Sequence, residues 1–152
     1  MAKNIYEALR ESHEIQRSLC RRLLRLKPES GKREETLREL RIELAAHAAA
    51  EERFLYAPIL MHDMGLNSSR HALAEHHEID ERIEDIYKAD YEGGSWLAKA
   101  KALSHKVHHH LREEEKKFFQ VSGKILTEAQ KLKLAKQYES DYARMKKQLS
   151  AA

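Results

Sequence analysis

Residues 37–54 read LRELRIELAAHAAAEERF, a segment in which apolar side chains recur every three or four positions. This spacing is typical of one face of an amphipathic helix. His47 and Glu51 belong to the same face, because residues four apart are stacked on one side of a helix. Burying a carboxylate costs several kcal/mol or more unless it is paired or bound to a metal. The segment therefore predicts a helix that points a functional imidazole–carboxylate pair into the core.

A second copy of this His-x-x-x-Glu pattern lies in another periodic segment, as His110-Leu-Arg-Glu-Glu114. Single histidines lie on or beside the apolar faces of two other predicted helices. In an up-down bundle, a rise of about 1.5 Å per residue would place all these side chains in one layer. We therefore predict a buried metal site. Its candidate ligands are His13, His47, Glu51, His76, His110 and Glu114.

The breakers between periodic segments predict an all-α protein. The predicted helices cover about residues 4–27, 34–61, 69–89, 96–121 and a fifth segment opened by a capping box at Thr127. Short connections imply antiparallel neighbours, and hence an up-down-up-down four-helix bundle over residues 1–121. Residues 122–152 are expected to form an additional C-terminal helix that packs on the bundle or on a partner subunit.

Three details of these boundaries follow from turn-forming residues. Residues 64–69 are predicted to be a turn whose serines cap the third helix, and Ser95 is predicted to cap the fourth. Pro58 should kink or terminate the end of the second helix.

Composition limits the class of partner. The chain has 152 residues, 35% of them charged, with a net charge of +3 and no dense basic block that would indicate nucleic-acid binding. Residues 1–9 contain no apolar h-region and no segment approaches 18 apolar residues, so we expect neither a signal peptide nor a membrane span. The single cysteine, Cys20, excludes an internal disulfide and favours a cytoplasmic protein. The apolar face of the predicted C-terminal helix could cover the bundle or form a dimer surface, so we expect a monomer or a homodimer.

The ligand types restrict the metal. Imidazole and carboxylate without thiolate suit iron, manganese or zinc. Two carboxylates between two sets of imidazoles could bridge a metal pair, and paired metals typically lie about 3.5–4 Å apart. Ferritin-like bundles use Glu-x-x-His on two helices, and that motif does not occur in this sequence.

The four motifs in this order resemble the hemerythrin-like (HHE) cation-binding family. They read Ser12-His13-Glu14, His47-x-x-x-Glu51 followed by Leu55-Tyr56, Glu75-His76-His77-Glu78-Ile79, and His109-His110-Leu111-Arg112-Glu113-Glu114-Glu115 followed by Phe118. The resemblance implies two iron ions, oxo- or hydroxo-bridged, in a four-helix bundle. His13 and His47 would bind one iron, His76 and His110 the other, and Glu51 and Glu114 would bridge them.

One position departs from the oxygen-carrying members of the family, which have a second histidine four residues before the one at position 76. Here that position is Ala72, and His71 is rotated away from it by about 100°. The resemblance then implies an open iron position that reacts with hydrogen peroxide, in a catalase-like reaction, or with nitric oxide. The alternative is non-enzymatic: oxygen or gas binding, sensing, or iron storage. Whether Glu115, His77 or His71 joins the site is left open.

Overall fold

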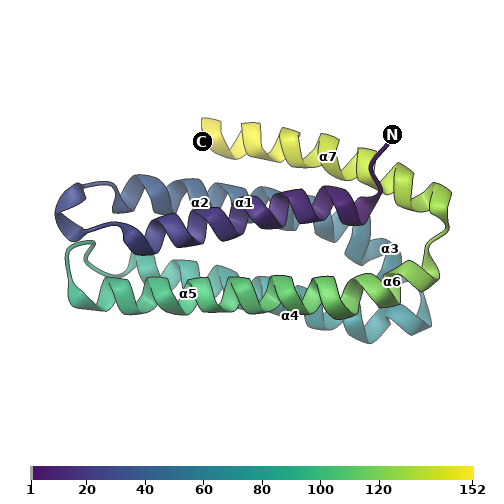
Figure 1. The fold of residues 1–152 in the computed structure, drawn as a ribbon, viewed down its shortest axis with the longest axis horizontal. Coiled ribbons are helices and arrows are strands. Elements are labelled where there is room, and N and C mark those ends of the chain that lie inside the picture. Colours follow the sequence, from purple (N-terminus) through teal and green to yellow (C-terminus); the bar gives the residue numbers. More distant parts are fainter. Residues whose placement is uncertain (1) are drawn as a thin grey trace.

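Four long antiparallel helices run along the long axis of the molecule in the computed structural model, which describes residues 2–152 (Figure 1). In chain order the elements are α1 (Ile5–Arg25), the 3₁₀ turn η1 (Pro28–Ser30), α2 (Arg33–Glu51), the π-helical turn η2 (Glu52–Tyr56), α3 (Ala57–Leu60), α4 (Asp63–Tyr87), α5 (Gly94–Glu113), the π-helical turn η3 (Glu114–Phe118), α6 (Phe119–Ile125) and α7 (Glu128–Ala151). The predicted all-α bundle with an extra C-terminal helix is confirmed.

The long helices pack in a ring. Helix α2 packs against α1, α1 against α5, and α5 against α4, while α4 returns to η2 and α3. Helix α7 lies along α1 and α2 on the outside of the ring (Figure 1). Its N-terminus is closed by the predicted capping box, in which Thr127 accepts from the backbone of Gln130 and the Gln130 side chain accepts from that of Thr127.

The apolar core is divided into two clusters by a layer of polar side chains. One cluster, around Leu23, Leu40 and Trp96, lies at the end of the bundle where α1 and α4 have their C-termini. The other, around Ile5 and Ile59, lies at the opposite end. Along each helix the candidate ligands lie close to the point where residues of the first cluster are replaced by residues of the second. Apolar side chains therefore pack on both sides of the polar layer along the bundle axis.

The predicted turn at residues 64–69 is wrong. Helix α4 already begins at Asp63, so the connection is reduced to Met61 and His62. Met61 keeps a helical backbone after α3, and His62 is extended (φ −104°, ψ 136°) before α4 begins. Gly65 lies inside the new helix because the chain passes very close to Ile59 there, and a Cβ on Gly65 would come 2.3 Å from Ile59 Cγ2. Ser69 is buried within α4 and caps nothing.

The predicted cap at Ser95 is also wrong. Helix α5 begins two residues earlier than predicted, at Gly94, with Gly93 in extended conformation as its N-terminal flanking residue. The second and fourth predicted helices are, in addition, not continuous. Each changes to a single π turn at its glutamate, and α3 with Pro58 follows the first of these turns.

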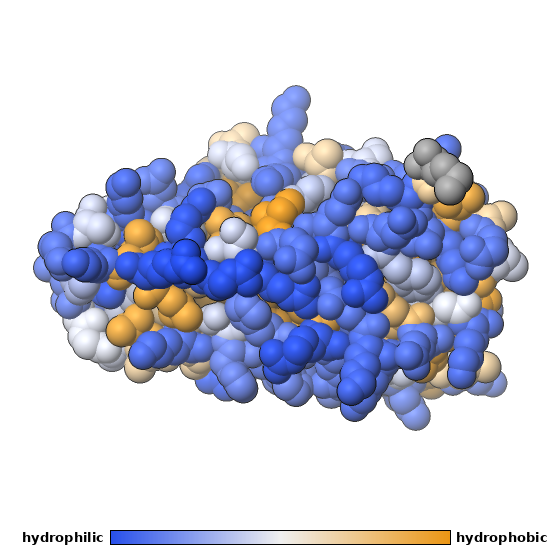
Figure 2. All heavy atoms as spheres, in the orientation of Figure 1, coloured by the Kyte–Doolittle hydropathy of each residue, from blue (hydrophilic) through white to orange (hydrophobic). Residues whose placement is uncertain are grey.

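Hydrophilic side chains cover most of the face shown in Figure 2, with apolar residues scattered among them. Within residues 2–152, no helix combines the length and the apolar character that crossing a bilayer requires.

Candidate metal centre

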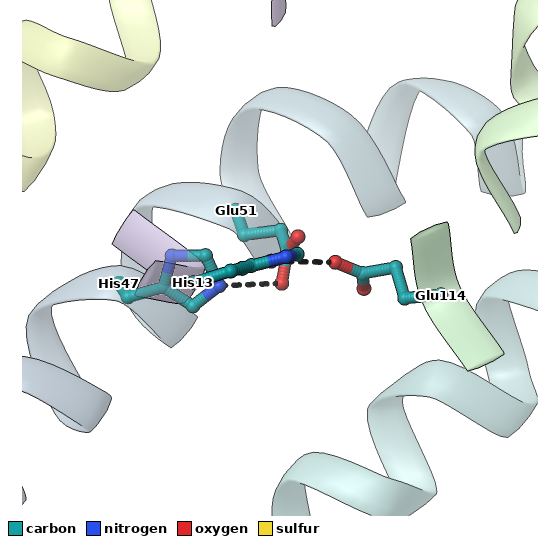
Figure 3. A group of neighbouring side chains, drawn as sticks. All are labelled: His13, His47, Glu51 and Glu114. Atoms are coloured by element: carbon teal, nitrogen blue, oxygen red, sulfur yellow. Dashed lines mark ion pairs between the residues drawn. The ribbon is translucent and has the colours of Figure 1, made fainter. Parts of the chain in front are cut away.

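The six predicted ligand residues meet in the polar layer. They come from α1 (His13), α2 (His47 and Glu51), α4 (His76), α5 (His110) and η3 (Glu114), and all are buried. Their side chains form two groups of possible metal ligands, each with two histidines, and both groups share Glu51 and Glu114. Figure 3 shows the group with His13 and His47, whose rings point toward the two carboxylates.

Short distances connect the imidazoles to the shared carboxylates. Glu51 Oε1 lies 3.1 Å from His47 Nε2 and 3.2 Å from His76 Nε2. Glu114 Oε1 lies 3.1 Å from His13 Nε2, and its Oε2 lies 3.7 Å from His110 Nε2. Each carboxylate therefore faces one imidazole from each group, which is the arrangement that two bridging ligands require.

Most of the imidazole Nε2 atoms and carboxylate oxygens that face the centre lack hydrogen bonds among the described residues. The atoms without a partner include Nε2 of His13, His47 and His110, both carboxylate oxygens of Glu51, and Oε1 of Glu114. An unsatisfied buried polar group typically costs about 1–3 kcal/mol, and more if it is charged. Six such atoms aimed at one region need a positive charge between them. The residues present therefore fit a metal pair.

The outer nitrogen of every ring is, in contrast, well bonded. The Nδ1 atoms of His13, His47, His76 and His110 lie 2.7–2.9 Å from Glu115, Tyr138, Glu52 and Glu75, respectively. Three of these partners are carboxylates, so Nδ1 is the donor and a neutral ring presents its Nε2 lone pair to the centre. Such partners orient metal-binding histidines and increase their basicity.

The charges of the site stabilise one another. Burial disfavours the charged form of His13, but the carboxylates of Glu114 and Glu115 outweigh it and raise its pKa to about 9. In His76, burial is likewise outweighed by Glu51 and Glu52, and the pKa rises to about 10. Without a metal, protons would thus hold the positions that a cation takes up.

Tyr56 joins the site although its spacing from Glu51 in a regular α-helix predicts a different face. Its hydroxyl donates to Glu114 Oε2 and lies 3.3 Å from His76 Nε2, and its side chain is fully buried. Tyr56 follows Glu51 by five residues, a spacing that an α-helix would rotate away from the site. The π turn η2 uses i→i+5 hydrogen bonds and returns Tyr56 to the glutamate's face. Burial and the neighbouring carboxylates raise its pKa, so the phenol keeps its proton.

The three residues left open by the sequence lie outside the centre. Glu115 bonds the outer nitrogen of His13 and pairs with Arg17, at 2.8 Å. His77 is exposed and lies beside Glu81. His71 is also exposed and faces Glu113.

Of the four residues that contact the outer ring nitrogens, only Glu115 was a candidate from the sequence, whereas Glu52, Glu75 and Tyr138 were not. Glu52 and Glu75 are adjacent to candidate ligands along the chain, which is the only local sign of their role. Tyr138 lies on α7, far along the chain from every candidate ligand, so only the fold brings it to His47.

A pocket of about 260 Å³ reaches the centre from the side of α4 and α5. Ala72, His110 and Glu114 line its inner part, and His71 and Glu113 line its outer part. Ala72 lies one helical turn before His76 on α4, and its small side chain leaves this part of the pocket open.

Residues 4–121 match the family described as "Hemerythrin HHE cation binding domain". The chain belongs to this family. A hemerythrin HHE cation binding domain-containing protein from Mycobacterium kansasii has a similar structure, with a TM-score of 0.86 and 22% identity, over 96% of this chain and 89% of that one. At that identity the likeness concerns the fold. No curated protein matches the chain.

The HHE family description agrees with the clustered acidic and imidazole side chains of the centre. The family is a cation-binding one, and this chain concentrates two acids and four imidazoles at one buried point. The HHE match ends at residue 121, whereas Tyr138 of α7 still contacts the centre. The C-terminal helix thus adds a contact to the domain from outside the matched segment.

Proposed function

We propose that this HHE domain holds two iron ions and decomposes hydrogen peroxide in a catalase-like reaction. His13 and His47 would bind one iron, His76 and His110 the other, and Glu51 and Glu114 would bridge them. The observation that supports reactivity is the pocket at Ala72, which extends from the His110 and Glu114 side chains to the surface. If His110 and Glu114 hold iron, a small oxidant could reach that iron through this pocket.

The reaction balances without an external reductant. One peroxide is reduced to two waters and a second is oxidised to dioxygen, and the iron pair, when bound, supplies the redox change. The side chains of the protein would orient the metal ligands and control the proton positions around them. The four outer acceptors hold the histidine rings, and Tyr56 keeps a proton at its hydroxyl beside Glu114. Phe118 and Ala72 line the approach.

Replacing Ala72 with histidine tests the proposal directly. In iron-loaded Ala72→His, the new imidazole should enter the pocket, bind the open position and reduce oxygen evolution from peroxide by at least about tenfold. Ala72→Val is the matched control, because it adds volume without a metal ligand and should retain most of the activity. Oxygen electrode traces measure both, and iron content checks that the site is loaded.

Peroxide turnover by the unmodified protein separates the two classes of function. Many equivalents of oxygen per iron pair are expected. A single stoichiometric spectral change with no sustained oxygen release would contradict catalysis and favour gas binding, sensing or iron storage. Nitric oxide is the other candidate substrate, and its consumption by the same Ala72 variants tests it.

We also infer that residues 1–121 are the metal-binding unit and that residues 122–152 are an accessory helix on it. The packing of α7 along α1 and α2 supports this division.

A further inference from the structure

A second group of metal-ligand side chains lies at the outer end of the Ala72 pocket. His71 and Glu75 belong to α4, and Glu113 is the last residue of α5. His71 Nε2 lies 3.2 Å from Glu113 Oε1 and 3.5 Å from Glu75 Oε1. One possible ligand atom from each residue lies within 4.8 Å of the others. None of the three belongs to the inner six, so this is a separate cluster.

The cluster extends from the surface into the pocket. The His71 side chain is 59% exposed, that of Glu113 is 26% exposed, and that of Glu75 is only 6% exposed. All three line the pocket whose inner part reaches His110 and Glu114. A cation arriving from solvent would therefore meet this cluster before it met the inner centre.

Glu75 is fixed in position by contacts on its inner side. Its Oε1 accepts from His110 Nδ1 at 2.9 Å, and its Oε2 accepts from Lys106 Nζ at 3.4 Å. A cation must compete with the Lys106 ammonium for Glu75. Lys106 also pairs with Glu78, so it keeps a partner if it leaves Glu75.

His109 can complete the ligand set. Its Nε2 lies 3.7 Å from Glu113 Oε2 and its Nδ1 lies 4.0 Å from Glu75 Oε2. It belongs to α5 and is half exposed, so its ring can turn toward the cluster without disturbing the core.

We propose that His71, Glu75 and Glu113 bind one divalent transition-metal cation at the mouth of the pocket. Imidazole with carboxylate suits zinc, ferrous iron and manganese, and water or His109 fills the remaining positions. The shared Glu75 places this outer cation one side chain away from His110. The outer site acts as a point where cations gather before they reach the centre. Its existence does not depend on the chemistry proposed for the inner iron pair.

Zinc titration of the metal-free full-length protein by isothermal titration calorimetry tests the proposal. His71→Ala/Glu113→Gln should lose one bound equivalent relative to the unmodified protein. The control His77→Ala/Glu81→Gln removes another exposed pair of α4, whose atoms lie 3.7 Å apart, and should keep every equivalent. Equal stoichiometry in all three proteins overturns the proposal.

The same titration distinguishes failure of the inner centre from failure of the outer site. If only the outer site binds zinc, the unmodified protein takes up one equivalent and His71→Ala/Glu113→Gln takes up none. The single variant His71→Ala, at a mostly exposed position, should weaken the outer equivalent by at least about tenfold, as the loss of one ligand interaction of about 1.4 kcal/mol or more implies. An unchanged affinity in that variant also overturns the proposal.

Discussion

Tyr138 connects the C-terminal helix to the metal centre through one phenol oxygen. This oxygen lies 2.7 Å from His47 Nδ1 and 2.6 Å from the Ser12 hydroxyl, and the side chain is buried. With His47 as the donor to Tyr138, and Tyr138 as the donor to Ser12, all three groups are satisfied. The phenol then holds the His47 ring with its Nε2 toward the centre.

Replacing Tyr138 with phenylalanine should weaken metal binding by about 10- to 100-fold, because the outer nitrogen of His47 loses its partner. Competition with a chromophoric chelator measures the affinity. Tyr142→Phe is the matched control, since Tyr142 lies one turn further along α7 and bonds Glu43, at 2.7 Å, instead of the centre. If both variants bind metal equally well, Tyr138 has no positioning role.

Tyr56→Phe removes the hydroxyl that contacts Glu114 and His76 but keeps the ring that packs on Phe118. We expect the variant to retain both metals and to lose peroxide turnover by about tenfold or more, because the centre loses a hydrogen-bond donor held in a fixed position. Oxygen evolution and iron content are measured on the same sample. Unchanged turnover at full iron loading would assign Tyr56 to packing alone.

The start of α4 depends on a close approach to α3 that only glycine permits. A methyl group on Gly65 would meet both the Ile59 side chain, at 2.3 Å, and the Ile59 carbonyl, at 2.5 Å. The backbone carbonyl cannot move aside as a flexible side chain could. Gly65→Ala should therefore lower the free energy of unfolding by about 1–3 kcal/mol.

Gly123→Ala provides the control for this prediction. Gly123 lies inside α6, and the nearest atom to an added Cβ is Tyr6 Oη at 3.8 Å, which is ordinary contact. Alanine there should raise the free energy of unfolding by about 0.5–1 kcal/mol, because glycine loses more conformational freedom in a helix. Chemical denaturation followed by circular dichroism measures both variants, and a shift of the same sign in both would refute the steric explanation.

The two π turns explain how two helices can each present more than one side chain to the same point. Each turn coincides with a candidate bridging glutamate: η2 follows Glu51 directly, and η3 begins at Glu114. The extra residue per turn changes which side chains face inward. Tyr56 reaches the centre through η2, while Glu115 in η3 reaches the outer nitrogen of His13.

In the whole molecule, protons and metal compete for the same buried nitrogens. The pKa of His13 is about 9 and that of His76 about 10, both above the ordinary 6.5. Because these pKa values are raised, the folded metal-free protein binds more protons than the unfolded chain between about pH 6.5 and pH 10. The stabilisation is complete below about pH 6.5 and is lost as pH rises to about 9–10.

The metal-free protein should accordingly melt at a higher temperature at pH 6.5 than at pH 9.5. Added iron or zinc should raise the melting temperature and should do so more at the higher pH, because the imidazoles no longer have to release protons. Thermal unfolding in the presence and absence of chelator at several pH values checks both trends. If the melting temperature of the metal-free protein increased between pH 6.5 and pH 9.5, the pKa values of His13 and His76 would not be raised as described.

The six inward residues could be predicted because helix geometry is local. Spacing of four residues places His47 with Glu51, and His110 with Glu114, on one face, while short loops bring the four faces to a common height. The turn at residues 64–69 was mispredicted because glycine and serine also occur where helices pack closely. Gly65 serves close packing there, and that need arises only from its neighbour Ile59.

Local periodicity therefore specified the helices, the buried faces and the polar layer. Packing between distant segments decided the rest. The π turns change the register by one residue, and the outer acceptors Glu75 and Tyr138 lie 35 and 91 positions from the rings that they hold. Such contacts leave no periodic trace in the chain, because a single hydrogen bond needs only one suitable residue at one point in space.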